Sequence, residues 1–124
     1  MVNKILLFIG AALPFFWGVS HLFPTRPVVN GFGEVSLDNK RIITMEWIIE
    51  GVALIFIGVV VATVTYIDYT HLISRTIYWI SFVMLNVLSL ISLFTGYKIN
   101  FVPFKLCPVI FTSSSILIML GCYI

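Results

Sequence analysis

Charged residues are scarce in this chain. Only 10% of the 124 residues carry a formal charge, whereas 60% are hydrophobic, and the mean hydropathy is +1.13. A soluble domain of this size cannot bury so much apolar surface. The composition therefore excludes an ordinary soluble protein and places the chain in a lipid bilayer.

Basic clusters and paired cysteines are also missing. The net charge is only +2, and no stripe of Lys and Arg is present, which excludes a nucleic-acid partner. Cys107 and Cys122 lie in one apolar segment, about 22 Å apart along a helix, so they cannot form a disulfide with each other. No Cys-x-x-Cys motif indicates zinc or redox chemistry, and we expect neither a metal nor a cofactor.

Four apolar segments make up most of the chain, and each is long enough to cross the hydrocarbon core. They cover about residues 5–23, 44–67, 72–94 and 101–124. The first lacks the small-residue cleavage site of a signal peptide, so we expect it to remain as a helix, kinked at Pro14. The prediction is an all-α integral membrane four-helix bundle, a single domain over residues 1–124.

The loop over residues 24–43 holds most of the polar residues and has structure of its own. Pro24 and Pro27 favour an extended beginning, and the run Asn30-Gly31-Phe32-Gly33 predicts a turn. Ser36 is a suitable helix N-cap. We expect a helix that runs unbroken from Leu37 into the second span, with its first turns outside the bilayer core.

The predicted topology places different numbers of basic residues on the two sides of the membrane. Five belong to the side of the first and third loops and two to the side of the termini and second loop. This asymmetry favours a cytoplasmic location for the first and third loops. The five are Arg26, Lys40, Arg41, Lys98 and Lys105, and the two are Lys4 and Arg75.

Glu50 is the one acidic residue clearly inside an apolar segment, and Glu46 lies one helical turn before it on the same face. Ionisable residues inside a span are functional candidates by default. Such a pair could bind a cation, carry a proton or act as general acid and base. The alternative is structural, with Glu46 in solvent and Glu50 bonded to a neighbouring helix.

His21 ends the first span on the same side of the membrane as Glu46 and Glu50. It lies on one face of the predicted helix with Gly10, Pro14 and Trp17. If this stripe faces the second span, His21 meets Glu46 or Glu50, although an interfacial histidine is often only hydrogen-bonded. His71 lies on the opposite side, which excludes a haem held by both histidines.

Asn86 shares a stripe of the third span with Trp79, Phe82 and Ser89. An amide at this depth most often forms an interhelical hydrogen bond, and the alternative is that it lines a cavity with Glu50. A pocket between the first three spans would have Trp17, Trp47 and Phe82 as apolar walls and His21, Glu50 and Asn86 as polar groups.

Small residues indicate where helices approach closely. Gly18, Gly51, Gly58 and Gly121 are packing candidates, and residues 112–115 are small enough for a close contact. None of the glycines forms a Gly-x-x-x-Gly dimer motif.

The second span contains Glu50-Gly51-Val52-Ala53-Leu54-Ile55-Phe56-Ile57-Gly58. This acidic-Gly-apolar-Gly pattern, the four spans and the long first loop resemble the DoxX-like group of small four-helix membrane proteins. The resemblance implies a membrane-embedded binding or accessory role linked to quinone or redox metabolism.

Three functions stay open from the sequence. The first is an accessory subunit or a binder of an apolar ligand, such as a quinone or a lipid, with membrane lipids, another membrane protein or a second copy as partners. The second is an intramembrane enzyme, isomerase-like, with His21, Glu46 and Glu50 as catalytic acids and bases on a lipidic substrate. The third is a proton-coupled transporter that works as an oligomer.

Overall fold

The computed structural model describes residues 1–124 and is a bundle of helices without strands. Its four long helices confirm the predicted fold class, and the first of them begins three residues before the predicted span. They are α1 (Val2–Leu22), α3 (Leu37–Asp68), α4 (Leu72–Phe94) and α5 (Val102–Tyr123). A short helix, α2 (Thr25–Asn30), and a 3₁₀ turn, η1 (Gly96–Lys98), lie in the connections.

All four long helices are long and apolar enough to cross a membrane. Between 22% and 39% of the residues in their most apolar windows are buried within the chain, so most of this apolar surface requires lipid around it. The chain is a multi-pass integral membrane protein.

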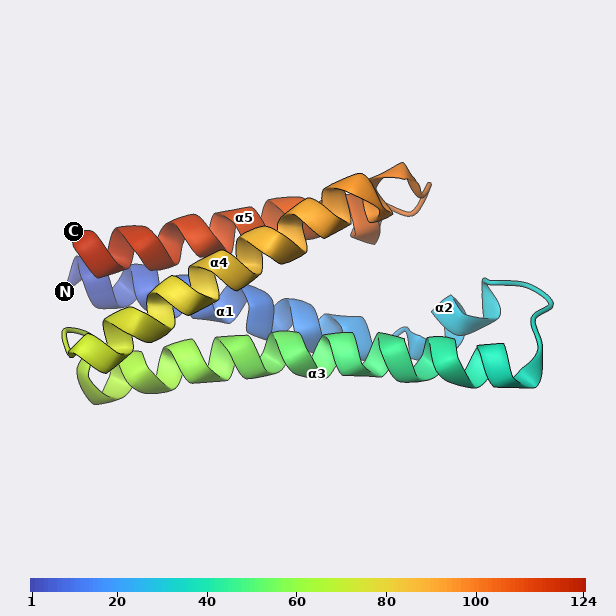
Figure 1. The fold of residues 1–124 in the computed structure, drawn as a ribbon, viewed down its shortest axis with the longest axis horizontal. Coiled ribbons are helices and arrows are strands. Elements are labelled where there is room, and N and C mark those ends of the chain that lie inside the picture. Colours follow the sequence, from blue (N-terminus) through green and yellow to red (C-terminus); the bar gives the residue numbers. More distant parts are fainter.

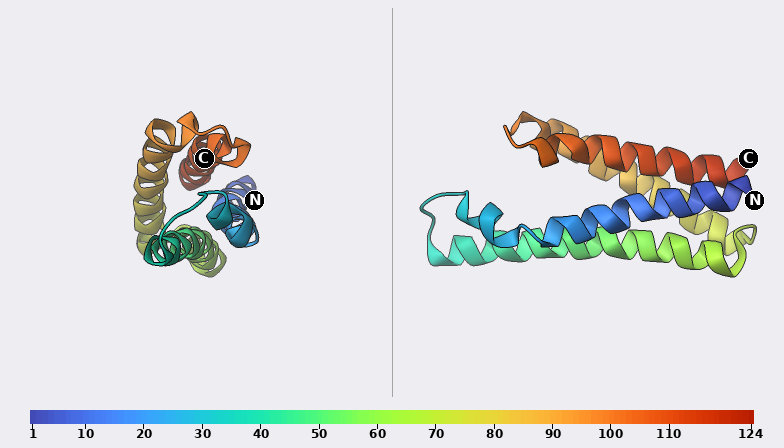
Figure 2. Two further views of the ribbon diagram at one scale, coloured as in Figure 1. Left: turned by 90° about the vertical axis from the view of Figure 1, so that its right-hand side faces the viewer. Right: turned by 180° about the vertical axis from the view of Figure 1, so that it is seen from behind.

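The helices are arranged so that α1 lies between α3 and α5, and α4 packs along α5 (Figure 1). Helix α4 starts beside the end of α3 and then crosses away from it toward the far end of α5, as the view along the bundle shows (Figure 2). The two termini lie together at one end, which we call the terminal end. The first and third loops lie at the other, which we call the loop end.

Small residues allow α1 to approach both of its neighbours closely. A Cβ atom added at Gly58 would lie 2.6 Å from the carbonyl oxygen of Ala11, and one at Gly121 would lie 2.7 Å from Cγ of Leu7. The Ser114 hydroxyl donates a hydrogen bond of 2.6 Å to the carbonyl oxygen of Gly10. The prediction that these small residues form helix contacts is therefore confirmed, because no larger side chain fits between the backbones.

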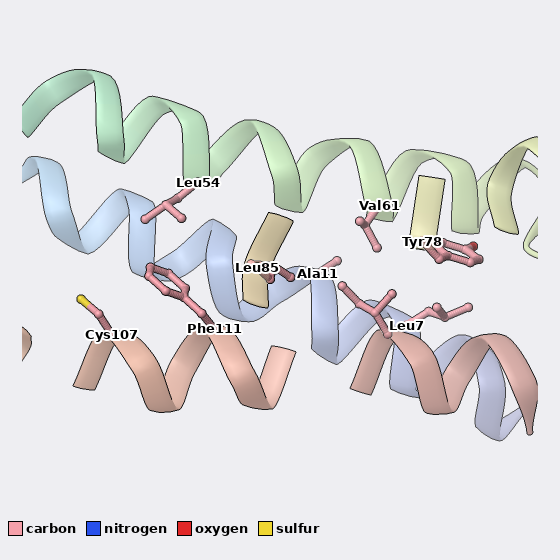
Figure 3. Close-up of a cluster of buried hydrophobic side chains, with 9 residues drawn as sticks. Leu7, Ala11, Leu54, Val61, Tyr78, Leu85, Cys107 and Phe111 are labelled. Carbon is pink, nitrogen blue, oxygen red and sulfur yellow. The ribbon is translucent and has the colours of Figure 1, made fainter. Parts of the chain in front are cut away.

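The buried core runs along the middle of the bundle and contains residues from all four long helices (Figure 3). Toward the terminal end, Leu7, Val61 and Tyr78 meet with no measurable exposure. Leu54, Cys107 and Phe111 continue the core toward the loop end (Figure 3).

Hydroxyl groups connect the helices where apolar packing alone gives little specificity in lipid. The Tyr78 hydroxyl lies 2.9 Å from the Thr65 hydroxyl, which connects α4 to α3 at the terminal end. Farther along α4, the Ser89 hydroxyl lies 2.8 Å from that of Thr112 and donates to the carbonyl oxygen of Pro108 on α5.

The first loop is partly as predicted. Its beginning is not extended, because Thr25–Asn30 forms α2 with Pro27 in the first turn, where a missing N–H costs no hydrogen bond. Gly33 adopts a positive φ of 78°, as the turn signal indicated, and the Ser36 hydroxyl caps α3 by accepting from the Asn39 N–H. Helix α3 then continues for 32 residues without a break, as predicted, about 48 Å at 1.5 Å per residue.

Candidate functional site

His21 lies at the end of α1 and is held against α3 by a single aromatic residue. The imidazole stacks on the indole of Trp47, with 3.7 Å between ring centroids and 16° between the ring planes. The Trp47 Nε1–H donates a hydrogen bond of 2.7 Å to the carbonyl oxygen of His21. Because α1 ends here, this carbonyl has no helical partner and needs a donor from elsewhere.

The same imidazole approaches the candidate acid of α3. Its Nε2 atom lies 3.4 Å from Oε2 of Glu50, and no hydrogen bond of good geometry satisfies Nε2. The His21 residue is only 8% exposed, whereas the Glu50 side chain is 46% exposed. The pair therefore lies at a boundary, with the histidine inside the protein and the carboxylate facing outward.

Glu50 lines a cavity of about 370 Å³ at the loop end, where α4 and α5 stand away from α3. Its other walls are mainly apolar side chains of α4 and α5, with a few hydroxyl groups near the loop. They include Leu88, Ile91, Ser92, Phe104, Cys107 and Phe111. Glu50 is the only charged side chain among its lining residues.

A second hollow of about 440 Å³ continues from this cavity toward the first loop. The two share Glu50, Ile99 and Phe104, so they form one groove, which we call the loop-end groove. Glu46 and Trp47 line the outer part, and Glu46 is exposed. The expectation that Glu46 and Glu50 share a helix face therefore agrees with the structure.

A smaller cavity of about 140 Å³ lies beside His21, between α1, α3 and the start of α5. Trp17, His21 and Trp47 line it together with Phe101 and Pro103. The Trp17 Nε1 atom is buried without a hydrogen-bond partner, as is His21 Nε2. Both orphaned atoms come from the predicted stripe of α1, and both lie near the Glu50 region.

The structure brings together four of the six predicted ligand-binding residues and separates the other two. Trp17, His21, Trp47 and Glu50 gather at the loop end. Phe82 and Asn86 line none of the cavities around Glu50. The predicted interhelical hydrogen bond of Asn86 is wrong, because its amide donates to the carbonyl oxygen of Phe82 in the same helix, at 2.8 Å.

The position of α4 explains this difference. Most of the buried residues of α4 come one position before the residues of the predicted stripe. Trp79, on the predicted stripe, is 45% exposed. The buried residues are Ser74, Tyr78, Ser81, Leu85 and Ser89. The pocket is consequently walled by α4 and α5, not enclosed by the first three spans as expected.

Leu88, Phe104 and Phe111 are site residues that the sequence did not indicate. They are apolar residues in apolar spans, so they have no contrast with their neighbours. Phe104 makes an edge-to-face contact with Trp47, with 5.8 Å between centroids, and thereby connects α5 to the His21 region.

No group of three or more His, Cys, Asp or Glu side chains is placed to hold a metal ion. His71 caps α4 at the terminal end, where its Nδ1 accepts from the Ile73 N–H, so it contributes nothing to the site at His21.

Compared with known proteins, the chain matches no family model, no curated protein and no solved structure.

Proposed function

We propose that this protein binds an apolar ligand with one polar end, such as a lipid or a quinone, in the loop-end groove. The observation that supports this proposal best is the cavity of about 370 Å³ in which one carboxylate stands among apolar walls. Pockets of this size, with few polar groups that orient a ligand, are typical of small-molecule sites.

The depth of Glu50 agrees with an amphiphilic ligand. Glu50 precedes the end of α3 at Asp68 by 18 residues, about 27 Å along the helix. A hydrocarbon core of about 30 Å that begins near Asp68 therefore places Glu50 close to its opposite boundary. A polar end at Glu50 would lie near the level of the lipid headgroups, and an apolar portion would reach Leu88 and Phe111 at greater depth.

We extend the proposal to the protein partners of this chain and to its orientation in the membrane. Binding a quinone or lipid is compatible with an accessory role beside another membrane protein or a second copy, as the DoxX-like resemblance implies. The loop end, which carries five of the seven basic residues, would face the cytoplasm.

The test uses substitutions that fill the groove. Leu88 lines the cavity, and Leu90, two residues later on α4, is 55% exposed on the outer surface. Organic extracts of the purified wild type, Leu88→Trp and Leu90→Trp proteins are compared by mass spectrometry. We expect a lipid or quinone that the wild type and Leu90→Trp retain and that Leu88→Trp loses at least about tenfold, a difference of roughly 1.4 kcal/mol. Equal retention by all three proteins would contradict the proposal.

A second candidate is an intramembrane enzyme with acid and base chemistry on a lipidic substrate. The specific observation in its favour is the separation of 3.4 Å between His21 Nε2 and Glu50 Oε2 at the cavity wall. A proton can pass between a histidine and a carboxylate placed in this way. If the protein is an enzyme, Glu50→Gln and His21→Gln should each abolish turnover of a lipid substrate while the lipid still binds. If the protein is only a binder, the wild type itself shows no turnover.

A further inference from the structure

We propose that the polar end of the ligand is cationic, an ammonium group held between Glu46, Glu50 and the aromatic rings of the loop-end groove. This inference rests on the proposed function, because it names the chemical class of ligand for the same groove.

The charge of the groove points to a cation. Glu46 and Glu50 both line its outer part, and no Lys or Arg side chain lines either part. His21 is the one basic side chain within 4.0 Å of either carboxylate. The outer part of the groove is therefore lined by two acidic side chains and by no basic one.

The aromatic residues of the groove also indicate a cationic ligand, independently of the charges. Phe32, Trp47 and Phe104 line the outer part of the groove beside the two carboxylates. Aromatic faces attract an ammonium through the ring quadrupole, and cages of such rings recognise quaternary ammonium groups. The stacked imidazole of His21 covers one face of the Trp47 indole, and the edge contact with Phe104 fixes the ring, so the most accessible aromatic ring of the groove is that of Phe32, which is 55% exposed.

The buried histidine provides a further observation. His21 is more than nine-tenths buried, and its Nε2 has no hydrogen-bond partner yet lies 3.4 Å from the Glu50 carboxylate that lines the groove. It is placed to orient Oε2 of Glu50 and leaves Oε1 for a ligand. The apolar inner part, which begins at Glu50 and Phe104, would take the alkyl portion.

The test compares alkyl compounds with one common chain and three different heads: trimethylammonium, hydroxyl and carboxylate. Each is allowed to partition between protein-containing and protein-free nanodiscs of an uncharged sugar-headed lipid. We expect the trimethylammonium compound to bind about tenfold more tightly than the other two. Glu46→Gln and Glu50→Gln should each reduce this preference several-fold, and Glu34→Gln, an exposed loop residue outside the groove, should leave it unchanged.

The outcomes separate this inference from the proposed function. Equal binding of the three compounds, or preference for the carboxylate, with loss of binding in Leu88→Trp, would overturn the cationic head and leave the apolar site intact. No binding of any compound would overturn both. Because Glu46 is exposed, Glu46→Gln tests the charge even if Glu50→Gln fails to fold.

A competition distinguishes the two sources of an ammonium head. If phosphatidylcholine displaces the trimethylammonium compound, the occupant is a membrane lipid. If phosphatidylcholine has no effect and the preference persists, the occupant is a free amphiphilic cation. Both results support the shared chemistry of the site.

Discussion

At the terminal end of the bundle, α3 and α4 are held together by the Thr65 and Tyr78 hydroxyls, whereas at the loop end the same two helices diverge around a groove. Tyr78 has no exposed surface, and Glu50 on the groove is 46% exposed at its side chain. The difference separates two tasks in one small chain. Packing at the terminal end fixes the helices, and this leaves the loop end free to keep an open, polar-lined space.

The largest expected difference in stability between variants at the two ends comes from removing an aromatic side chain at each end. Tyr78→Ala removes a completely buried ring and its contact with Thr65, and we expect a loss of about 3 kcal/mol or more in the free energy of unfolding. Phe104→Ala removes a half-buried ring from a wall of the groove, and we expect less than about 1.5 kcal/mol. Unfolding in a mixed detergent series measures both values, and equal losses would show that the loop end is packed as tightly as the terminal end.

Replacing one glycine at each end should give a smaller difference in stability between the two ends. A Cβ at Gly58 would lie 2.6 Å from a backbone oxygen of α1, so we expect Gly58→Ala to destabilise the bundle by about 1–3 kcal/mol. At Gly96, beside the groove, the nearest atom would be 3.7 Å away, an ordinary contact. Gly96→Ala should therefore change the thermal midpoint little, and a large decrease would contradict the open geometry of this end.

The smallest expected effect is that of Trp47→Phe. The substitution keeps an aromatic ring beside His21 but removes the Nε1–H donor to its carbonyl oxygen, a loss of about 0.5–1.5 kcal/mol. The comparison variant is Trp79→Phe, which removes an exposed bond to the Tyr123 hydroxyl at the terminal end. If the exposed Trp79 variant has the larger effect on the unfolding midpoint, then the Trp47 bond does not hold the end of α1.

The sequence predicts the spans of this protein well and the direction of its side chains only in part. Hydropathy alone locates four helices, and the Ser36 cap and the turn with Gly33 locate the start of α3. Helix α2 is missed because Pro24 and Pro27 favour an extended backbone before them, although a proline also fits the first turn of a helix.

For the site, the Glu46 and Glu50 spacing and the stripe that ends at His21 predict which residues gather at the loop end. The rotation of α4 is not predicted, because Trp79, Phe82 and Asn86 are more conspicuous than the serines that are in fact buried. The available signal is the spacing of Ser74, Ser81 and Ser89, since small polar residues in a membrane helix favour contacts between helices. Phe104 and Leu88 carry no signal, because the groove exists only once α4 has crossed away from α3.

The contact between Trp47 and His21 assigns different partners to the backbone and the side chain of the histidine. The indole donates to the main-chain carbonyl of His21 and not to its imidazole, so this hydrogen bond between α3 and α1 uses neither ring nitrogen. Nε2 is left to Glu50 alone. A substitution of the His21 side chain can therefore alter the contact with Glu50 while the main-chain carbonyl that accepts the Trp47 hydrogen bond stays in place.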